Sequence, residues 1–185
     1  MLNRAIYILI LIGLFFLGAT AFRSCQPTVQ SGFDAYAVDS LSRLTSLDAP
    51  PAQPLSKFVD VEGNEMTLAD LRGENVLLNV WATWCAPCIV ELPQLAELRA
   101  SRNDLRVVTV AFDAPEKVEE FLRREGLDLP TWTDPSYALT GRLQAPGLPI
   151  TILYNKGGRE VARVAGEADW TSPEADALID YLVTG

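Results

Sequence analysis

Two cysteines separated by two residues offer the clearest chemistry in this sequence. Cys85 and Cys88 stand in the pentapeptide Trp84-Cys85-Ala86-Pro87-Cys88, directly after the apolar run 76–81. A strand that ends in Cys-x-x-Cys places both thiols in the first turn of the following helix. There the helix dipole and unpaired backbone N–H groups stabilise a thiolate, so Cys85 can attack a disulfide at neutral pH. Cys88 can then close the ring and release the partner as a dithiol. The motif predicts a redox-active Cys85–Cys88 disulfide with Cys85 as nucleophile and Cys88 as resolving thiol.

Other uses of the two thiols fit the sequence less well. A closed zinc site needs four ligands, but the chain has one further cysteine, Cys25, and no histidine. Haem attachment requires a histidine after the second cysteine, where Ile89 stands. A structural bridge across two residues would constrain little of the unfolded chain. We therefore expect no metal and no cofactor besides the disulfide. A non-enzymatic Cu(I)-binding or redox-sensing module stays open, because thiolates are soft ligands.

The bulk composition narrows the class of partner. The chain has 185 residues, enough for one domain with a proper core and additional segments. Its net charge is −9 and it has no basic cluster, so we expect no nucleic-acid partner. The absence of histidine excludes histidine-based acid–base catalysis and histidine metal ligands.

The N-terminal region has the composition of a membrane segment. Ala5 to Phe22 is a stretch of eighteen residues without a charge. As a helix it would be about 27 Å long, close to the hydrocarbon thickness of a bilayer. We expect 1–23 to be a single-pass anchor in the cytoplasmic membrane or a signal peptide cleaved after Ala21, and the length favours the anchor. Either segment would place the rest of the chain in the periplasm or outside the cell.

Residues 24–54 look like a linker between this segment and a folded domain at 55–185. They contain a weakly amphipathic stretch with Val38, Leu41 and Leu44, which could form one helix. They end in Pro50-Pro51-Ala52-Gln53-Pro54, which is typical of a stiff spacer. Such a linker would hold the domain away from the membrane.

From residue 55 onward, strand patterns alternate with helix patterns. Apolar runs and turn residues predict a leading hairpin around Gly63-Asn64, a central strand followed by the helix that carries the cysteines, a second strand and helix, and a closing hairpin and helix. The predicted ranges are 58–61, 68–71, 76–82, 86–101, 105–112, 113–126, 137–143, 150–154, 160–164 and 172–182. This order predicts an α/β fold with a mixed sheet covered by helices on both faces.

These elements, in this order around Trp-Cys-x-Pro-Cys, resemble the thioredoxin fold. More narrowly, the chain resembles the membrane-tethered TlpA/ResA-like branch of the thioredoxin superfamily over about 54–185. Besides the cysteine motif, the resemblance rests on Glu91-Leu92-Pro93, which completes a Cys-x-x-Glu-x-Pro pattern, and on Gly147-Leu148-Pro149. Pro149 matches the cis-proline that lies opposite the dithiol in this family.

The resemblance assigns further site residues. Thioredoxin carries a buried aspartate six residues before its first cysteine, and Asn79 stands at that position here. Glu91 follows Cys88 by three residues and shares its helix face, so its carboxylate can accept and return the Cys88 proton. The alternative is a solvated helix residue. We expect Asn79 to be buried and hydrogen-bonded.

The same resemblance implies a surface for partner polypeptides. A cis Leu148–Pro149 bond would expose the Leu148 backbone to an extended substrate segment. Trp84 is expected on the surface beside the thiols, with burial in the core as the alternative. We expect substrate contacts at Trp84, Pro87, Leu148 and Pro149.

The direction of exchange is predicted to be reduction. Strong oxidants of this fold often carry a histidine between their cysteines, and Ala86-Pro87 contains none. We expect a reduction potential nearer to about −270 mV than to about −120 mV. The resemblance implies electrons from a membrane thiol-transfer protein supplied by cytoplasmic thioredoxin. It also implies apocytochrome c, a copper chaperone or an oxidase subunit as substrate. A disulfide oxidase or isomerase is the nearest alternative.

Overall fold

The computed structural model describes residues 32–47, 49, 53–60 and 62–185. The expected membrane anchor, the cleavage site after Ala21 and Cys25 lie outside these residues. Within the described part of the chain, no helix combines the length and apolarity needed to cross a bilayer.

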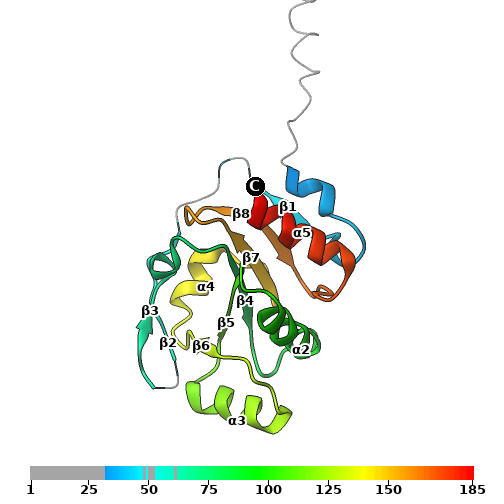
Figure 1. Ribbon diagram of the computed structural model, residues 1–185. Helices are drawn as coiled ribbons and strands as arrows, with labels where there is room; N and C mark the ends of the chain where they lie inside the picture. The colour runs from blue at the N-terminus through cyan, green and yellow to red at the C-terminus, as the bar shows by residue number, and fades with distance from the viewer. Residues whose placement is uncertain (1–31, 48, 50–52, 61) are drawn as a thin grey trace, which may run out of the picture. The chain divides into compact units, whose positions relative to one another are not determined.

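Eight strands form one mixed sheet in the order β1-β8-β7-β4-β5-β6-β2-β3 (Figure 1). Strands β4, β5 and β6 run parallel to one another, and β7 pairs antiparallel with β4. The carboxyl ends of three parallel strands therefore meet at one edge of the sheet, where the cysteine motif follows β4. The strands are β1 Leu44–Ser46, β2 Phe58–Val59, β3 Glu65–Met66, β4 Val76–Trp81, β5 Arg106–Ala111, β6 Thr131–Thr133, β7 Ile150–Tyr154 and β8 Glu160–Ala165.

Helices cover both faces of the sheet, as the sequence predicts. Helices α2, α3 and α5 contribute to the core on one face, and α4 with the 3₁₀ helix η3 contributes to the core on the other. The helices are η1 Gly32–Tyr36, η2 Asp39–Leu41, η3 Leu68–Leu71, α2 Ala86–Ser101, α3 Pro115–Glu125, α4 Ala138–Leu143 and α5 Pro173–Thr184. The thioredoxin-like α/β fold is thereby confirmed.

Strand β4 is buried along its whole length, because both faces of the sheet are covered there. Side chains alternate between the faces of a strand. Leu77 and Trp81 pack in the core that contains α2, and Leu78 and Val80 pack in the core that contains α4. By the same alternation, Asn79 lies on the α2 side. A polar side chain is therefore placed beneath the helix that carries the cysteines.

Helix α2 begins immediately after Cys85, which occupies the N-cap position with extended backbone. Its buried residues recur at the spacing of one helix face and are Cys88, Glu91, Leu92, Leu95 and Leu98. The helical period therefore puts the second cysteine and the glutamate on the face that packs against the sheet.

Most predicted elements from residue 58 onward are confirmed, with ends within one or two residues. The leading hairpin forms between β2 and β3, with Gly63 in left-handed backbone at φ +84°. The closing hairpin pairs β7 with β8. Strand β6 was not predicted, because a strand of three residues shows too little alternation to be recognised.

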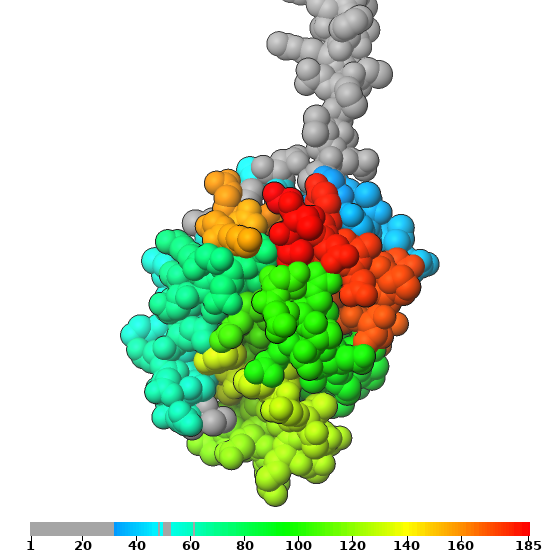
Figure 2. Space-filling model, viewed as in Figure 1, coloured from blue at the N-terminus to red at the C-terminus, as the bar shows by residue number. Residues whose placement is uncertain are grey.

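The predicted linker at 24–54 is wrong over 32–46, which we call the N-terminal segment. Its strand β1 pairs antiparallel with β8, with Leu44 opposite Val164. Leu41 is fully buried in the core beside α5. Phe33 packs edge-on against Tyr181 of α5 at 4.8 Å between ring centroids, and Figure 2 shows the blue segment against the red helix. Of the apolar side chains that suggested a spacer helix, Leu41 and Leu44 instead extend the core, while Val38 is exposed. The folded domain therefore begins before residue 55.

Candidate active site

Cys85 and Cys88 form a disulfide across the first turn of α2, with their Cα atoms 5.3 Å apart. The Cys85 N–H donates to the Ala82 carbonyl at 3.1 Å, and the Cys85 carbonyl accepts from the Ile89 N–H at 3.1 Å. Cys85 retains 5% of its accessible surface, whereas Cys88 is fully buried. A large partner can therefore approach this disulfide only from the side of Cys85.

The peptide bond between Leu148 and Pro149 is cis, as the resemblance to the thioredoxin fold implies. The bond lies just before β7, which pairs with the central strand β4. Leu148 and Pro87 of the cysteine motif line a common cavity. The fold therefore brings the proline loop next to the cysteine motif across about sixty residues of sequence.

A groove of about 560 Å³ opens beside the disulfide, and we call it the apolar groove. Trp84 is 69% exposed and lies along this groove, so its predicted surface position is confirmed. Three of the four predicted substrate residues line the groove, while Pro149 lines a neighbouring pocket instead. The lining residues are Trp84, Cys85, Ala86, Pro87, Phe112, Thr140, Ala145, Gly147 and Leu148.

Phe112 and the residues around α4 complete the groove, and the sequence analysis did not identify them. Phe112 packs edge-on against Tyr137 at 5.2 Å between ring centroids. Phe112 directly follows β5, whose last residue Ala111 is opposite Trp81 of β4. Because parallel strands end at the same edge of a sheet, the position of Phe112 directly after a predicted strand could have placed it beside the cysteines. No local signal could have placed Thr140.

Glu91 is fully buried, so the alternative of a solvated helix residue is wrong. Asn79 Nδ2 donates to Glu91 Oε1 at 2.6 Å and to Thr151 Oγ1 at 2.9 Å. The Ala168 backbone N–H donates to Glu91 Oε2 at 3.3 Å. Asn79 is itself fully buried, which confirms the expected buried and hydrogen-bonded position. Residues from β4, β7 and the stretch after β8 thus hold one carboxyl group, a turn of helix away from Cys88.

Burial raises the pKa of Glu91 from 4.5 to about 7. The hydrogen bonds from Asn79 and Ala168 and the Trp170 indole act in the opposite direction, and the negative charge of Glu167 raises the pKa slightly further. The Trp170 Nε1 atom makes no hydrogen bond of normal geometry within the described residues. Glu91 can therefore hold or release a proton near neutral pH.

This arrangement defines the class of protein. A disulfide at a helix N-terminus, a cis-proline loop beside it, a buried carboxyl behind the inner cysteine and an open apolar groove form the dithiol site of a thioredoxin-fold protein. Within the described part of the chain, no three acidic, cysteine or histidine side chains gather as metal ligands would.

Comparison with known proteins agrees with this class. The profile of the Redoxin family matches residues 47–179, which leaves the N-terminal segment outside the match. The chain is 30% identical over 139 residues to the thiol-disulfide oxidoreductase ResA of Bacillus cereus (strain ATCC 10987 / NRS 248), covering 74% of this chain and 80% of that protein. This chain belongs to the Redoxin family, in the TlpA/ResA-like branch of the thioredoxin superfamily.

One further relative and one solved structure show how much of the chain is similar to known proteins. The chain is 36% identical over 111 residues to the thiol-disulfide oxidoreductase ResA of Bacillus thuringiensis (strain Al Hakam), covering 58% of this chain and 64% of that relative. It thus spans just under two thirds of the length of such relatives. A Chlorobium tepidum crystal structure, described as a thiol:disulfide interchange protein DsbE, matches with a TM-score of 0.67 at 23% identity. That match covers 75% of this chain and 99% of the other, and it supports the fold.

Proposed function

We propose that this chain is a thiol–disulfide oxidoreductase that reduces disulfides in partner proteins. The observation that carries the proposal is the Cys85–Cys88 disulfide at the start of α2, with Cys85 as the more accessible of the two cysteines and beside the apolar groove. Similarity to ResA-type thiol-disulfide oxidoreductases supports the same activity.

The proposed exchange starts from the reduced protein. The Cys85 thiolate attacks one sulfur of the partner disulfide, and the other partner sulfur leaves as a thiolate that takes up a proton. The Cys88 thiolate then attacks Cys85 of the mixed disulfide, and the second partner thiol is released. Two electrons and two protons pass from the enzyme dithiol to the partner, and the enzyme is left with the disulfide present in the structure.

Glu91 is proposed to move the proton of Cys88. The carboxyl group lies one helical turn from Cys88 on the same buried face, and a pKa of about 7 lets it accept and return a proton at neutral pH. Asn79 positions the carboxyl group through its hydrogen bond to Glu91, and Thr151 positions Asn79 in turn.

The direction of exchange is tested by the reduction potential of the Cys85–Cys88 pair and by insulin reduction. A reductase is expected near about −270 mV, whereas a disulfide oxidase would lie near about −120 mV. The reduced protein should also reduce insulin disulfides. A reduction potential near about −120 mV would favour the disulfide oxidase over the reductase. If the protein leaves insulin disulfides unreduced, a Cu(I)-binding module is favoured instead.

The natural partners are proposed to be exported proteins with cysteine pairs, such as apocytochrome c, a copper chaperone or an oxidase subunit. Electrons are proposed to come from a membrane thiol-transfer protein. A Cys88→Ser variant lacks the resolving thiol, so Cys85 should remain covalently joined to these partners, which mass spectrometry can identify. If Cys85→Ser traps partners and Cys88→Ser does not, the two cysteines have the opposite roles.

We further propose that 1–23 anchors the protein in the cytoplasmic membrane and that the thioredoxin-like domain faces outward. The uncharged stretch from Ala5 to Phe22 supports this proposal. Membrane fractionation should recover the full-length chain with the membranes after a carbonate wash. Recovery as a soluble product beginning at Phe22 would show a cleaved signal peptide instead.

A further inference from the structure

A second pocket, of about 480 Å³, adjoins the active site, and we call it the polar pocket. It shares Pro87 and Leu148 with the apolar groove, and it also contains Pro149. Its remaining walls are polar and come from two other parts of the chain: Asp39, Ser40, Ser42, Arg43, Gly166 and Glu167. The motif and the cis-proline loop therefore separate two cavities of different chemical character.

The N-terminal segment supplies one wall of the polar pocket. The residues of this wall, 39–43, flank Leu41, whose side chain is fully buried in the core. They lead directly into β1, which pairs along its three residues with β8. The wall is therefore held on the folded domain by core packing and a strand ladder. A segment that lies outside the Redoxin match thus reaches the redox site.

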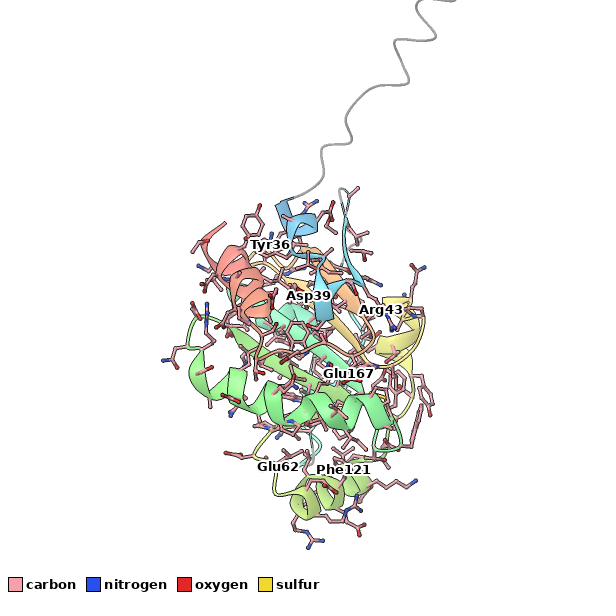
Figure 3. All side chains as sticks on the ribbon, turned by 90° about the vertical axis from the view of Figure 1, so that its right-hand side faces the viewer. Tyr36, Asp39, Arg43, Glu62, Phe121 and Glu167 are labelled. Carbon is pink, nitrogen blue, oxygen red and sulfur yellow. A yellow bond between two sulfur atoms is a disulfide. The ribbon has the colours of Figure 1, made fainter. Side chains whose placement is uncertain are left out.

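Three charged side chains lie at this pocket. Asp39, Arg43 and Glu167 are exposed, and Figure 3 shows them on one face of the molecule. None of them takes part in the ion pairs found among the described residues. The pocket thus offers charges that are available to a partner, with two carboxylates and one guanidinium.

Gly166 leaves room for the Arg43 guanidinium. Its backbone is left-handed at φ +103°, and a Cβ atom at this position would overlap the Arg43 side chain. The Gly166 N–H donates to the Pro149 carbonyl at 2.8 Å. Arg43 is therefore laid over the backbone that braces the cis-proline, and Glu167 follows immediately in sequence.

We infer that the polar pocket is a second substrate subsite, which receives a basic side chain of the partner polypeptide next to its disulfide. The inference rests on the proposed disulfide exchange. Side chains of an extended segment alternate in direction, so a segment passing Leu148 can direct one residue to the apolar groove and its neighbour to the polar pocket. The pocket has two carboxylates, Asp39 and Glu167, and one guanidinium, Arg43, so it favours a positively charged group. The net charge of −9 also attracts a positively charged partner.

The charge preference can be tested with peptides that contain one disulfide. The full-length reduced protein in detergent is assayed with three peptides that differ only in the residue beside the attacked cysteine: lysine, glutamine or glutamate. We expect kcat/KM for the lysine peptide to exceed that for the glutamine peptide about two- to fivefold, the range for exposed ion pairs. The glutamate peptide should be the poorest substrate, and the preference should shrink at high salt.

Two variants locate the effect. Glu167→Gln and Asp39→Asn each remove one carboxylate, and each should reduce the ratio between the lysine and glutamine peptides. Asp39 has left-handed backbone at φ +46°, which asparagine also adopts readily. Glu120→Gln, at an exposed position on α3, removes the same charge far from the pocket in sequence and is the matched control. Its ratio should remain that of the wild type.

The outcomes separate this inference from the proposed function. If the glutamine peptide is reduced but the three peptides react equally, or if both pocket variants keep the wild-type ratio, the subsite is wrong while the reductase stands. A preference for the glutamate peptide would likewise overturn it and would identify Arg43 as the dominant charge. If the reduced protein reduces none of the peptides, the proposed function fails, and the subsite with it.

Discussion

Beside the two cysteines, the site contains a buried carboxyl group, that of Glu91. It is a fully buried carboxyl group that accepts hydrogen bonds from Asn79 on β4 and from the Ala168 backbone. Thioredoxin places its buried carboxyl group on the strand, whereas here the strand carries an amide and the helix carries the acid. The amide at position 79 has no charge to repel Glu91, and its Nδ2 atom positions the carboxyl group instead. The buried carboxyl group therefore lies on the helix that bears Cys88.

The pKa of Glu91 predicts how stability depends on pH. Its folded-state pKa of about 7 lies above the ordinary value of 4.5, so the folded state binds more protons than the unfolded chain between these values. The stabilisation is complete below about pH 4.5 and is lost as the pH rises through 7; the shift corresponds to about 3 kcal/mol. Urea unfolding of the oxidised protein should therefore show a lower free energy of unfolding at pH 8 than at pH 5.

Glu91→Gln should flatten this pH dependence, because the variant has no group to ionise in the buried site. At pH 8 the variant should be more stable than the wild type. Glu97→Gln is the control, since Glu97 is exposed on the same helix, and its curve should follow that of the wild type. Equal slopes for the wild type and Glu91→Gln would show that Glu91 does not titrate in this range.

The same substitution should slow the resolving step. Without a proton acceptor beside Cys88, decay of the mixed disulfide should be about a hundredfold slower at pH 7, at the lower end of the range for acid–base catalysis. The first attack by Cys85 should change much less. Stopped-flow measurement of mixed-disulfide formation and decay checks this, and the wild-type decay rate should rise with pH through about 7. A variant that slows both steps equally would argue against this role.

At the level of elements, the apolar groove depends on a helix that cannot form alone. Helix α4 has six residues, and both flanking residues, Tyr137 and Gln144, adopt left-handed backbone without being glycine. Surrounding side chains fix both ends. The buried Asp134 carboxylate accepts from the first backbone N–H groups at 2.9–3.1 Å, and Arg163 donates to the Leu143 carbonyl at 2.9 Å. Tertiary contacts therefore hold the wall that faces the cysteines.

Asp134→Ala tests that dependence. Loss of the cap leaves several backbone N–H groups unpaired, so the free energy of unfolding should fall by about 2 kcal/mol. Because Thr140 lines the apolar groove, KM for peptide disulfides should also rise. Denaturant unfolding and steady-state kinetics check both effects. Asp128→Ala removes an exposed carboxylate before β6 and should change neither quantity appreciably.

At the level of the whole domain, the N-terminal segment is part of the fold as well as part of the polar pocket. It adds an edge strand beyond β8 and contributes Leu41 and Leu44 to the core that also contains α5. Its loss would expose the β8 edge and these contacts together. A segment joined to the core in this way can keep Asp39 and Arg43 in place beside the cis-proline.

Leu44→Ala should lower the free energy of unfolding by about 2–5 kcal/mol, the usual range for a buried leucine. Thr45 is the matched neighbour, because its side chain is exposed on the same strand. Thr45→Ala should cost much less. If both variants unfold at the same denaturant concentration as the wild type, the segment contributes nothing to the folded domain.

The sequence by itself determined the elements whose signals are local. A buried strand followed by Cys85-Ala86-Pro87-Cys88, the helical spacing that places Glu91 with Cys88, and the turn residues of both hairpins predicted the core order correctly. The helix predicted around Leu41 and Leu44 is wrong. A spacing of three residues is typical of a helix, and a strand of three residues is too short to show alternation. The pairing partner that makes them a strand lies more than a hundred residues away.

Only the tertiary structure decided the properties of the site that depend on what surrounds each group. Whether Glu91 is solvated or buried depends on β4, β7 and the stretch after β8 closing over it, and its pKa follows from that burial. The apolar groove and the polar pocket are built from segments that meet only at the edge of the sheet. Periodicity along a chain reports which face of an element is apolar. It does not report which distant residues will share a cavity, because that is set by how the elements pack.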